Sequence, residues 1–418
     1  MQELLYLTHR IPYPPNKGDK VRSFNELKYF SRHYRIHLGT FIDDPADWEH
    51  VETVKSYCVD TYFAPLNPKL ARIKSAKGLL TGEALTLPYY RHQGLASWVN
   101  RLVAEGRVSY AIAYSSSMAQ YLHAASHMRR VANIADVDSD KWRQYALTQP
   151  WPLAWVYGRE AKKLGEFERR LVTEFDATVL HAPHEAEFLR GQVPEAPERV
   201  HHSSNGVDAE YFSPDHHFPS PYASNETVLV FTGAMDYWPN VDAVEWFADE
   251  IFPAVRRSQP RARFYVVGAR PVARLDRLKH LDGVTVTGSV PDVRPYLAHA
   301  VLAVAPLRIA RGIQNKVLEA MAMAKAVVLS PQAAAGIAAQ TEREFVVAPD
   351  SSAFAAAVCR LLTDEAREAI GRAARARVLT DYSWNTNLSR LDALLRGSRI
   401  GSDAPSAILP LHSRVAMP

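Results

Sequence analysis

Short apolar segments with strand character alternate with longer helical segments along this chain, and the alternation occurs twice. The expected strands are Leu4–Leu7, Ile36–Phe41, Ala111–Tyr114, Val131–Ala135 and Thr178–His181 in the first half, and Val228–Thr232, Phe264–Val267, Val284–Thr287, Leu302–Ala305 and Val327–Ser330 in the second. Such alternation is typical of parallel, doubly wound sheets with helices on both faces. The sequence therefore predicts an α/β protein of two doubly wound domains facing each other across a cleft, where open sheets of this kind bind ligands.

Length and composition limit what these domains can be. The 418 residues are 47% hydrophobic, enough for two ordinary cores, and no run approaches the ~20 apolar residues of a membrane span. Because residues 1–10 lack the basic and long apolar segments of a signal peptide, we expect a cytoplasmic protein. Cys58 and Cys359 lie far apart and indicate neither a disulfide framework nor a cysteine-rich metal site. A net charge of +4 does not support nucleic-acid binding, although a basic patch could favour an anionic ligand or lipid headgroup.

The expected boundaries follow composition and helical spacing. We predict a first domain over residues 1–205 and a second over 206–380, with the Pro- and Ser-rich segment Ser213–Asn225 as the linker. Leu388, Leu391 and Leu395 recur at helical spacing, which predicts a packing helix over 381–396 with Ser383 or a neighbour at its N-cap, returning toward the first domain. Residues 397–418 have the composition of a disordered tail.

The segment from Pro306 to Ser330 carries the strongest chemical signal. It reads as a strand end, a glycine loop, a helix and a second buried strand. A helix entered through a glycine loop presents unpaired N–H groups and its positive dipole end, which suits a diphosphate. Lys316 and Glu319 are three residues apart on that helix and can share a face, one meeting phosphate and the other accepting sugar hydroxyls. The pattern predicts a site for a sugar nucleotide.

Five stretches together carry a family resemblance that extends from about residue 5 to residue 396. They are Pro14–Arg22, Ser204–Pro214, Phe231–Asn240, Thr287–Leu297 and the Lys-x-x-Glu-Ala-Met-Ala segment over 316–322. In this order the chain resembles the retaining glycosyltransferases of the family-four type, which have two Rossmann-like domains in the arrangement called GT-B. It further resembles the sugar transferases associated with bacterial exosortase/PEP-CTERM exopolysaccharide loci.

The resemblance implies a set of donor-binding residues. They are Gly18, Lys20, Gly233, Val290, Arg308, Arg311, Gly312, Ile313, Gln314, Asn315, Lys316 and Glu319. Arg311 stands where the family usually has the first of two glutamates, so no carboxylate contact with the transferred sugar is carried over. Arg308, Arg311 and Lys316 are instead expected to stabilise the departing nucleoside diphosphate, so that no metal or other cofactor is needed. Ala324 and Ala326 replace commoner Gly and Pro, which we interpret as packing variation.

Three aspartates are the catalytic candidates. Asp136 and Asp138 follow an apolar strand, and alternation along an extended segment would place them on one side. A metal-binding Asp-x-Asp pair is the alternative that the GT-B resemblance disfavours, and an Asx turn or helix cap is another. The family places a polar residue beside the anomeric carbon, for which Asp138 is the first choice and Asp136 the second. Asp19 accompanies Gly18 and Lys20 in the loop after the first strand, and Arg22 could add an anion contact.

The resemblance and the residues together predict transfer of a sugar from a nucleotide-sugar donor to a glycan or polyprenyl-linked acceptor. A nucleotide-sugar 2-epimerase and a non-catalytic nucleotide- or glycan-binding protein are the alternatives. Peripheral contact with the cytoplasmic face of the inner membrane stays open. The basic helical stretch Arg159–Phe175 could serve it, but a core-facing helix is the preferred interpretation.

Overall fold

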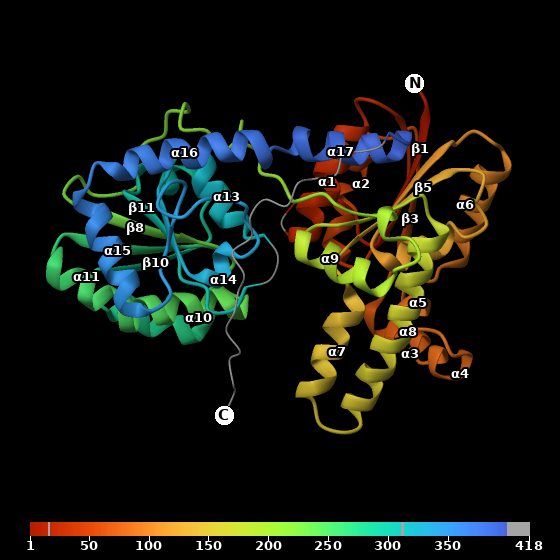
Figure 1. The fold of residues 1–418 in the computed structure, drawn as a ribbon, viewed down its shortest axis with the longest axis horizontal. Helices are drawn as coiled ribbons and strands as arrows, with labels where there is room; N and C mark the ends of the chain where they lie inside the picture. Colours follow the sequence, from red (N-terminus) through yellow and green to blue (C-terminus); the bar gives the residue numbers. More distant parts are fainter. Residues whose placement is uncertain (16, 311–312, 399–418) are drawn as a thin grey trace. The chain divides into compact units, whose positions relative to one another are not determined.

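The computed structural model describes residues 1–15, 17–310 and 313–398, and these divide into two compact units. Among the described residues, the first unit contains 1–204 and 387–398, and the second contains 205–386 (Figure 1). Arg311, Gly312 and the predicted tail from residue 399 lie outside the described residues.

The first unit is built on a seven-stranded sheet in which every neighbouring pair is parallel, in the order β3-β2-β1-β4-β5-β6-β7. The strands are β1 (Glu3–Thr8), β2 (Arg35–Ile42), β3 (Asp60–Pro65), β4 (Tyr110–Tyr114), β5 (Arg129–Ala135), β6 (Ala177–Leu180) and β7 (Val200–His202). The five strands predicted here are confirmed. The edge strands β3 and β7 were not predicted, because β3 is only partly buried and β7 is three residues long.

Helices cover both faces of this sheet, as parallel strands buried on two sides require. They are α1 (Gly18–Phe30), α2 (Val51–Lys55), α3 (Pro68–Ser75), α4 (Lys77–Thr81), α5 (Thr86–Tyr89), α6 (Gln93–Ala104), α7 (Asp138–Thr148), α8 (Leu153–Glu174) and α9 (Pro183–Gln192), with 3-10 turns at Pro45–His50, Ser116–Tyr121 and Pro197–Arg199. Helices α7 and α8 form a hairpin that projects from the sheet (Figure 1).

The C-terminal helix α17 (Trp384–Arg396) continues from the second unit into the first. Its first turn is capped by Ser383, whose Oγ accepts a hydrogen bond of 3.1 Å from the Thr386 amide, as the capping prediction requires. Farther along, the Leu394 carbonyl accepts a 3.0 Å hydrogen bond from Arg129, and Asp392 accepts one from Tyr34. The end of the helix therefore packs on the first unit.

A buried polar network ties α1 to the sheet and to the end of the first unit. The Arg22 guanidinium lies 2.6 Å from Glu26 and donates to the carbonyls of Ser203 and Ser204 at 2.7 and 2.8 Å. Asn133 on β5 donates to the same glutamate at 2.8 Å. A buried guanidinium needs such partners to offset its desolvation. Arg22, which the sequence suggested as an anion contact, is thus occupied by structural contacts.

The second unit has a six-stranded parallel sheet in the order β10-β9-β8-β11-β12-β13. Its strands are β8 (Thr227–Thr232), β9 (Ala262–Val267), β10 (Val284–Gly288), β11 (Leu302–Ala305), β12 (Val327–Leu329) and β13 (Val346–Val347). Its helices are α10 (Trp238–Trp246), a π-helical turn at Phe247–Ile251, α11 (Phe252–Ser258), a 3-10 helix at Ala273–His280, α12 (Arg294–His299), α13 (Asn315–Ala322), α14 (Pro331–Ala334), α15 (Ser351–Thr363) and α16 (Ala366–Asp381). All five predicted strands are present, and only the two-residue β13 was missed.

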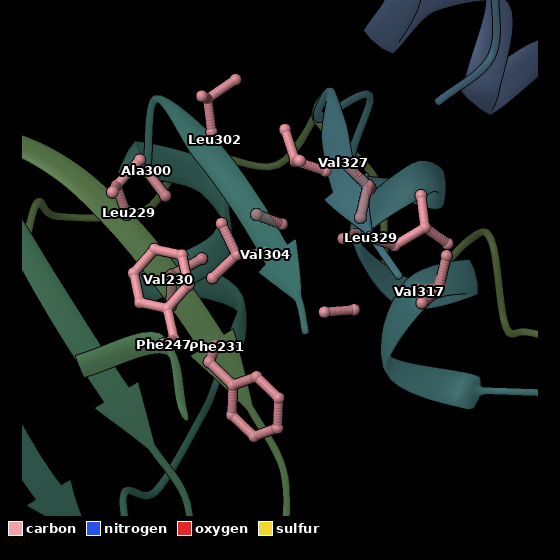
Figure 2. Packing of buried hydrophobic residues seen from close by; sticks show 14 of the residues in the cluster. Leu229, Val230, Phe231, Phe247, Ala300, Leu302, Val304, Val317, Val327 and Leu329 are labelled. Atoms are coloured by element: carbon pink, nitrogen blue, oxygen red, sulfur yellow. The ribbon is translucent and has the colours of Figure 1, made fainter. Parts of the chain in front are cut away.

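The core of this unit consists of side chains from the central strands and the helices that cover them. Figure 2 shows Phe231 and Val304 from the neighbouring strands β8 and β11 together with Val317 from α13. All three are buried, as are the remaining residues of β8 after Thr227. An unbroken apolar run of this kind is expected for a strand covered on both faces.

The segment Ser213–Asn225 is not the linker that its composition suggested, because it lies within the second unit. Tyr222 donates a hydrogen bond of 2.7 Å to the carbonyl of Tyr296, and its ring packs on Tyr265 at 4.7 Å between centroids. His299 lies 2.7 Å from the carbonyl of Phe218. Phe218 and Tyr222 therefore anchor the segment, and its turns lie outside this pair, at residues 214–215 and 224–225.

Ala324 is more than a packing variant, because it forms the C-terminal cap of α13. Its φ of 54° is left-handed, a conformation that an L-residue adopts at a cost and glycine adopts freely. The Lys325 amide donates to the Ala320 carbonyl and the Ala324 amide to the Met321 carbonyl, both at 3.0 Å. This is the Schellman arrangement, in which glycine usually occupies the position of Ala324.

Replacing Ala324 with glycine should therefore stabilise the protein. We expect Ala324→Gly to raise the free energy of unfolding by about 0.5–1 kcal/mol, since the strain removed exceeds the entropy gained by the unfolded chain. Chemical denaturation measures this. Ala326→Gly is the matched control and should be destabilising, because Ala326 is buried and its φ is not left-handed. Equal destabilisation by both changes would contradict this account of the cap.

Candidate functional site

The predicted donor residues other than Gly18 and Lys20, as far as the structure describes them, belong to the second unit. Strand β8 lies between β9 and β11, so the chain order reverses beside it, and Gly233 directly follows its carboxyl end. The chain leaves the neighbouring β11 at Pro306 and enters α13 at Asn315. Ligands of open α/β sheets bind at such a switch point, at the carboxyl ends of the strands. The topology therefore brings Gly233, Arg308 and the first turn of α13 to one edge of the sheet.

Lys316, in the first turn of α13, is held against this edge. Its Nζ donates a hydrogen bond to Oδ1 of the buried Asn240 and lies 4.5 Å from the centre of the Phe231 ring. Burial lowers the pKa of Lys316 to about 7, and burial raises the pKa of Glu319, one turn later, to about 7. The Glu319 carboxylate accepts no hydrogen bond from the described residues, while its backbone carbonyl accepts one from the Met323 amide at 3.1 Å. The site thus offers a poorly solvated ammonium and an unused acceptor to an anionic ligand with hydroxyl groups.

Two glycines make room for this arrangement. Gly233 has a φ of 154°, and an added Cβ would lie 2.8 Å from Asn240 and 3.2 Å from the Lys316 ammonium. A Cβ on Gly268 would lie 1.7 Å from the Gly233 carbonyl oxygen. Each clash involves the loop at the end of β8, so glycine at both positions lets that loop pack closely beside Lys316.

Arg308 follows β11 but is turned toward α10. It forms an ion pair with Asp242, with its Nε 3.0 Å from the carboxylate, and lies 5.6 Å from the centre of the Trp246 ring. The hydrogen bonds to Asp242 raise the pKa of the arginine above its usual value. Because the side chain is about half exposed, this ion pair contributes little to stability and could be exchanged for a ligand phosphate.

The other predicted donor residues of the second unit lie near the start of α13 or pack against the core of the unit. Gln314 is the N-cap residue of α13, and Ile313 and Val290 pack partly buried against the core of the unit. Oδ1 of Asn315 is buried without a hydrogen-bond partner among the described residues, so it is available to a donor group of a ligand. Arg311 and Gly312 lie outside the described residues.

The first sheet has its own switch point, where β1 lies between β2 and β4. His9 follows β1 there, and the sequence analysis missed it. Its Nε2 lies 3.3 Å from Asp19, its ring stacks on Tyr114 at 5.8 Å, and its Nδ1 is buried without a partner in the part of the chain that the structure describes. The signal that could have revealed it is a histidine directly at the end of the first apolar strand.

Asp19 is a fixed anion beside this histidine. Burial alone would raise its pKa, but the hydrogen bond from His9 and the charge of Arg10, 2.5 Å away, hold the pKa well below its usual range. Arg10 is in turn paired with Asp43 at 2.9 Å. Asp19 therefore remains charged at neutral pH and is placed to orient the His9 ring, rather than to exchange a proton itself.

Gly18 and Lys20 differ in how freely they could meet a ligand. Gly18 is the exposed first residue of α1, and an added Cβ would meet no protein atom within 4 Å, so packing does not require glycine there. The Lys20 ammonium is buried and lies 2.7 Å from both carboxylate oxygens of Asp47. A donor contact by Lys20 stays a prediction, and it would have to replace this ion pair.

Asp136 and Asp138 do not lie on a common extended segment, so the argument from alternation is wrong. Ala135 adopts a left-handed φ of 66°, Asp136 is exposed, and α7 begins at Asp138. Burial raises the pKa of Asp138. Burial also raises the pKa of Glu168, to about 8, and the carboxylate of Glu168 accepts a hydrogen bond from the Ser139 hydroxyl. Within the described ranges, no group of three or more His, Cys, Asp or Glu side chains has the arrangement of a metal site.

The basic stretch Arg159–Phe175 belongs to α8 and faces the core. Leu164, Phe167 and Leu171 are buried, which confirms the preferred interpretation. Arg159 donates to two backbone carbonyls, those of Gly78 and Glu83, at 2.6 and 3.0 Å. No helix among the described residues is both long and apolar enough to cross a bilayer.

Comparison with known proteins agrees with this geometry. Residues 226–364 match the family described as glycosyl transferases group 1. Three solved structures are similar: HepE from Anabaena in complex with UDP (14% identity, 95% of this chain and 100% of that one, TM-score 0.66), sucrose-phosphate synthase from Thermosynechococcus elongatus (17%, 95% and 99%, 0.66), and WaaG, a glycosyltransferase involved in lipopolysaccharide biosynthesis (14%, 94% and 100%, 0.63). No curated protein matches the chain by sequence.

The two parallel Rossmann-like sheets and the structural likeness define a GT-B type of fold. The matched residues contain β8 to α15, and with them Gly233, Lys316 and Glu319. Residues 226–364 of the second unit therefore match the group 1 glycosyltransferase family, and the chain shares the fold of solved glycosyltransferase structures.

A methyl group at Gly233 should disturb the site without unfolding the protein. We expect Gly233→Ala to weaken nucleoside diphosphate binding at least tenfold, about 1.4 kcal/mol, because the new Cβ pushes against Asn240 and Lys316. Titration calorimetry measures the affinity, and circular dichroism checks the fold. Gly191→Ala is the control, since its Cβ would meet no atom within 4 Å. Equal affinity of Gly233→Ala and the wild type would contradict the geometry of the site.

Proposed function

We propose that this glycosyltransferase moves a sugar from a nucleotide-sugar donor to a glycan acceptor, with retention of configuration at the anomeric carbon. The observation that carries the proposal is the position of Lys316, partly buried in the first turn of α13 and held by Asn240 at the switch point of the second sheet. An ammonium with a lowered pKa in such a place gains free energy when a diphosphate arrives, because the anion favours its charged form.

In the proposed complex, the donor diphosphate lies at the N-terminus of α13. Backbone amides and the helix dipole favour negative charge there, and Lys316 adds a full positive charge. Glu319 is placed one turn farther along to accept hydrogen bonds from the ribose hydroxyls. HepE, with which the chain shares its fold, has been solved with UDP and with UDP-glucose, which supports a uridine diphosphate sugar as the first donor to test.

Departure of the nucleoside diphosphate is the step in which negative charge grows, and cations held near it lower the barrier. Lys316 is the cation that the described site contains. Arg308 can join it by exchanging Asp242 for phosphate, and Arg311 is proposed from the sequence alone. These groups and the helix amides can carry the leaving-group charge, so the proposal does not call on a metal ion or other cofactor.

The acceptor is proposed to bind the first unit at the carboxyl ends of β1 and β5. Asp138 is the first candidate to hold the reacting hydroxyl, with Asp136 second, and Asp19 acts by orienting His9. Gly18 leaves open space at the start of α1 for close approach of a sugar. A glycan or polyprenyl-linked glycan is the proposed acceptor class, as in exopolysaccharide synthesis of the exosortase/PEP-CTERM type on the cytoplasmic side of the membrane.

The pH dependence of donor binding should have two separable limbs. Diphosphate binding raises the pKa of Lys316 and takes up a proton, so affinity falls as pH rises above about 7. Ribose binding lowers the pKa of Glu319 and releases a proton, so affinity also falls as pH drops below about 7. We expect a maximum near neutral pH for the wild type.

A nucleotide sugar is the appropriate probe for this measurement, because its diphosphate diester does not titrate near neutrality. Calorimetry from pH 5.5 to 9 should show that Glu319→Gln loses the acidic limb and Lys316→Met loses the alkaline limb. Retention of both limbs in either variant would show that other groups titrate.

Transfer itself is tested by incubating the purified enzyme with labelled UDP-sugars and a lipid extract as acceptor source. Lys316→Ala and Glu319→Ala should lose donor affinity and transfer at least a hundredfold while remaining folded, and Lys279→Ala, an exposed lysine, should not. Unchanged donor affinity in the first two variants would contradict the site. Isomerised sugar without an acceptor would indicate a 2-epimerase, and binding without turnover would indicate a non-catalytic protein.

A further inference from the structure

Two segments of the first unit expose large apolar side chains to solvent. In the α3–α4 segment, residues 67–82, Leu70, Ile73 and Leu80 are 55, 72 and 92% exposed. At the end of α7, in the turn that follows it and at the start of α8, Leu147, Trp151 and Trp155 are 77, 83 and 57% exposed. Together with Leu79, Tyr145 and Leu153, these account for nine of the nineteen exposed large hydrophobic residues in the described chain. Such concentration marks an interaction surface.

The α3–α4 segment is basic, and neither segment contains an acidic residue. No aspartate or glutamate occurs between Asp60 and Glu83, or between Asp140 and Glu160. The basic side chains interleaved with the apolar ones in the first segment are Lys69, Arg72, Lys74 and Lys77. Lys141 and Arg143 precede the second segment in α7 and are ion-paired with Asp138 and Asp140. All six of these side chains are exposed. The surface therefore combines apolar area from both segments with positive charge from the α3–α4 segment.

The two segments are fixed to each other through α8. Arg159, one turn beyond Trp155, donates to the carbonyls of Gly78 in α4 and Glu83 just after it. The neighbouring Glu160 accepts hydrogen bonds from the amides of Leu85 and Thr86 at 2.5 and 3.0 Å. Figure 1 shows α3 and α4 beside α8, and the start of α8 lies at the projecting end of the α7–α8 hairpin. We call these two segments together the apolar–basic surface.

We propose that the apolar–basic surface docks the enzyme on the surface of a bilayer that contains anionic lipid. Tryptophan prefers the membrane interface, where its ring is buried and its N–H stays hydrated, while leucine and isoleucine enter the acyl region. Lysine and arginine between them meet anionic headgroups. A protein partner is disfavoured, because lysine is depleted in the cores of protein interfaces, whereas three of the four basic residues in the α3–α4 segment are lysine.

This inference deepens the proposed function, since a polyprenyl-linked acceptor resides in the bilayer. It also moves the membrane contact away from Arg159–Phe175, whose apolar side faces the core and whose Arg159 is bonded to backbone carbonyls. The contact is assigned to the start of α8, the end of α7 and the α3–α4 segment.

The test is co-sedimentation of the full chain with vesicles of phosphatidylcholine, with and without phosphatidylglycerol. We expect the wild type to bind the anionic vesicles at least tenfold more tightly than the neutral ones. The double variants Trp151→Ser/Trp155→Ser and Lys69→Glu/Lys74→Glu should each bind at least tenfold more weakly. Phe188→Ser, which removes an exposed aromatic ring from α9, is the matched control and should bind within twofold of the wild type.

Absence of binding to anionic vesicles, or equal binding by the variants and the wild type, would overturn the proposal. A wild-type dimer that the tryptophan variant loses, seen by light scattering without lipid binding, would instead assign the surface to a second copy of the chain. The nucleotide response separates this inference from the proposed function. The surface variants should keep the wild-type shift in melting temperature with UDP, and vesicle binding without such a shift would contradict the donor site alone.

Discussion

Parallel strands that are buried on both faces impose the constraint on which this structure depends. Each strand must be followed by a crossover that covers the sheet and returns to its starting edge, so all carboxyl ends lie on one edge. In the second sheet the order reverses beside β8, and this brings Gly233 and Lys316, 83 positions apart, into contact distance. The same reversal beside β1 brings His9 next to Tyr114.

The chemistry of the second site follows from a balance between burial and charge. Desolvation disfavours the Lys316 ammonium, and among the described residues it is opposed by the hydrogen bond that the ammonium donates to Asn240, the face of the Phe231 ring and the charge of Glu319. A structural lysine would have a carboxylate in direct contact, as Lys20 has in Asp47. In the proposed function this incomplete pairing suits Lys316 to a diphosphate, because the anion would stabilise the charged form that burial disfavours.

Most of the fold could be predicted from the sequence, because buried parallel strands are unbroken apolar runs. All ten predicted strands are present. Strand β3 was not predicted because it is partly exposed, and β7 and β13 were not predicted because they are only three and two residues long. The linker prediction failed because proline and serine report turns, and the anchoring of Phe218 and Tyr222 is a tertiary contact that composition does not show.

The site was predictable where local sequence determines it and less so elsewhere. Lys316 and Glu319 follow from helical spacing, but the commitment of Lys20 to Asp47, 27 residues away, could not be read from the loop. The relation of Asp136 to Asp138 depends on the left-handed φ of Ala135, which is unusual for alanine. His9 lacked a motif, and its importance appears only through its contacts with Asp19 and Tyr114.

The central claim is that the second unit holds the diphosphate of a nucleotide sugar. The most direct measurement is a thermal-shift screen of the purified protein against UDP, GDP, ADP, CMP and their common sugar conjugates, since a ligand that binds only the native state raises the melting temperature. The account predicts selective stabilisation by one nucleoside diphosphate and its sugar conjugates, uridine being the first expectation. The absence of a response to every compound in the panel would contradict it.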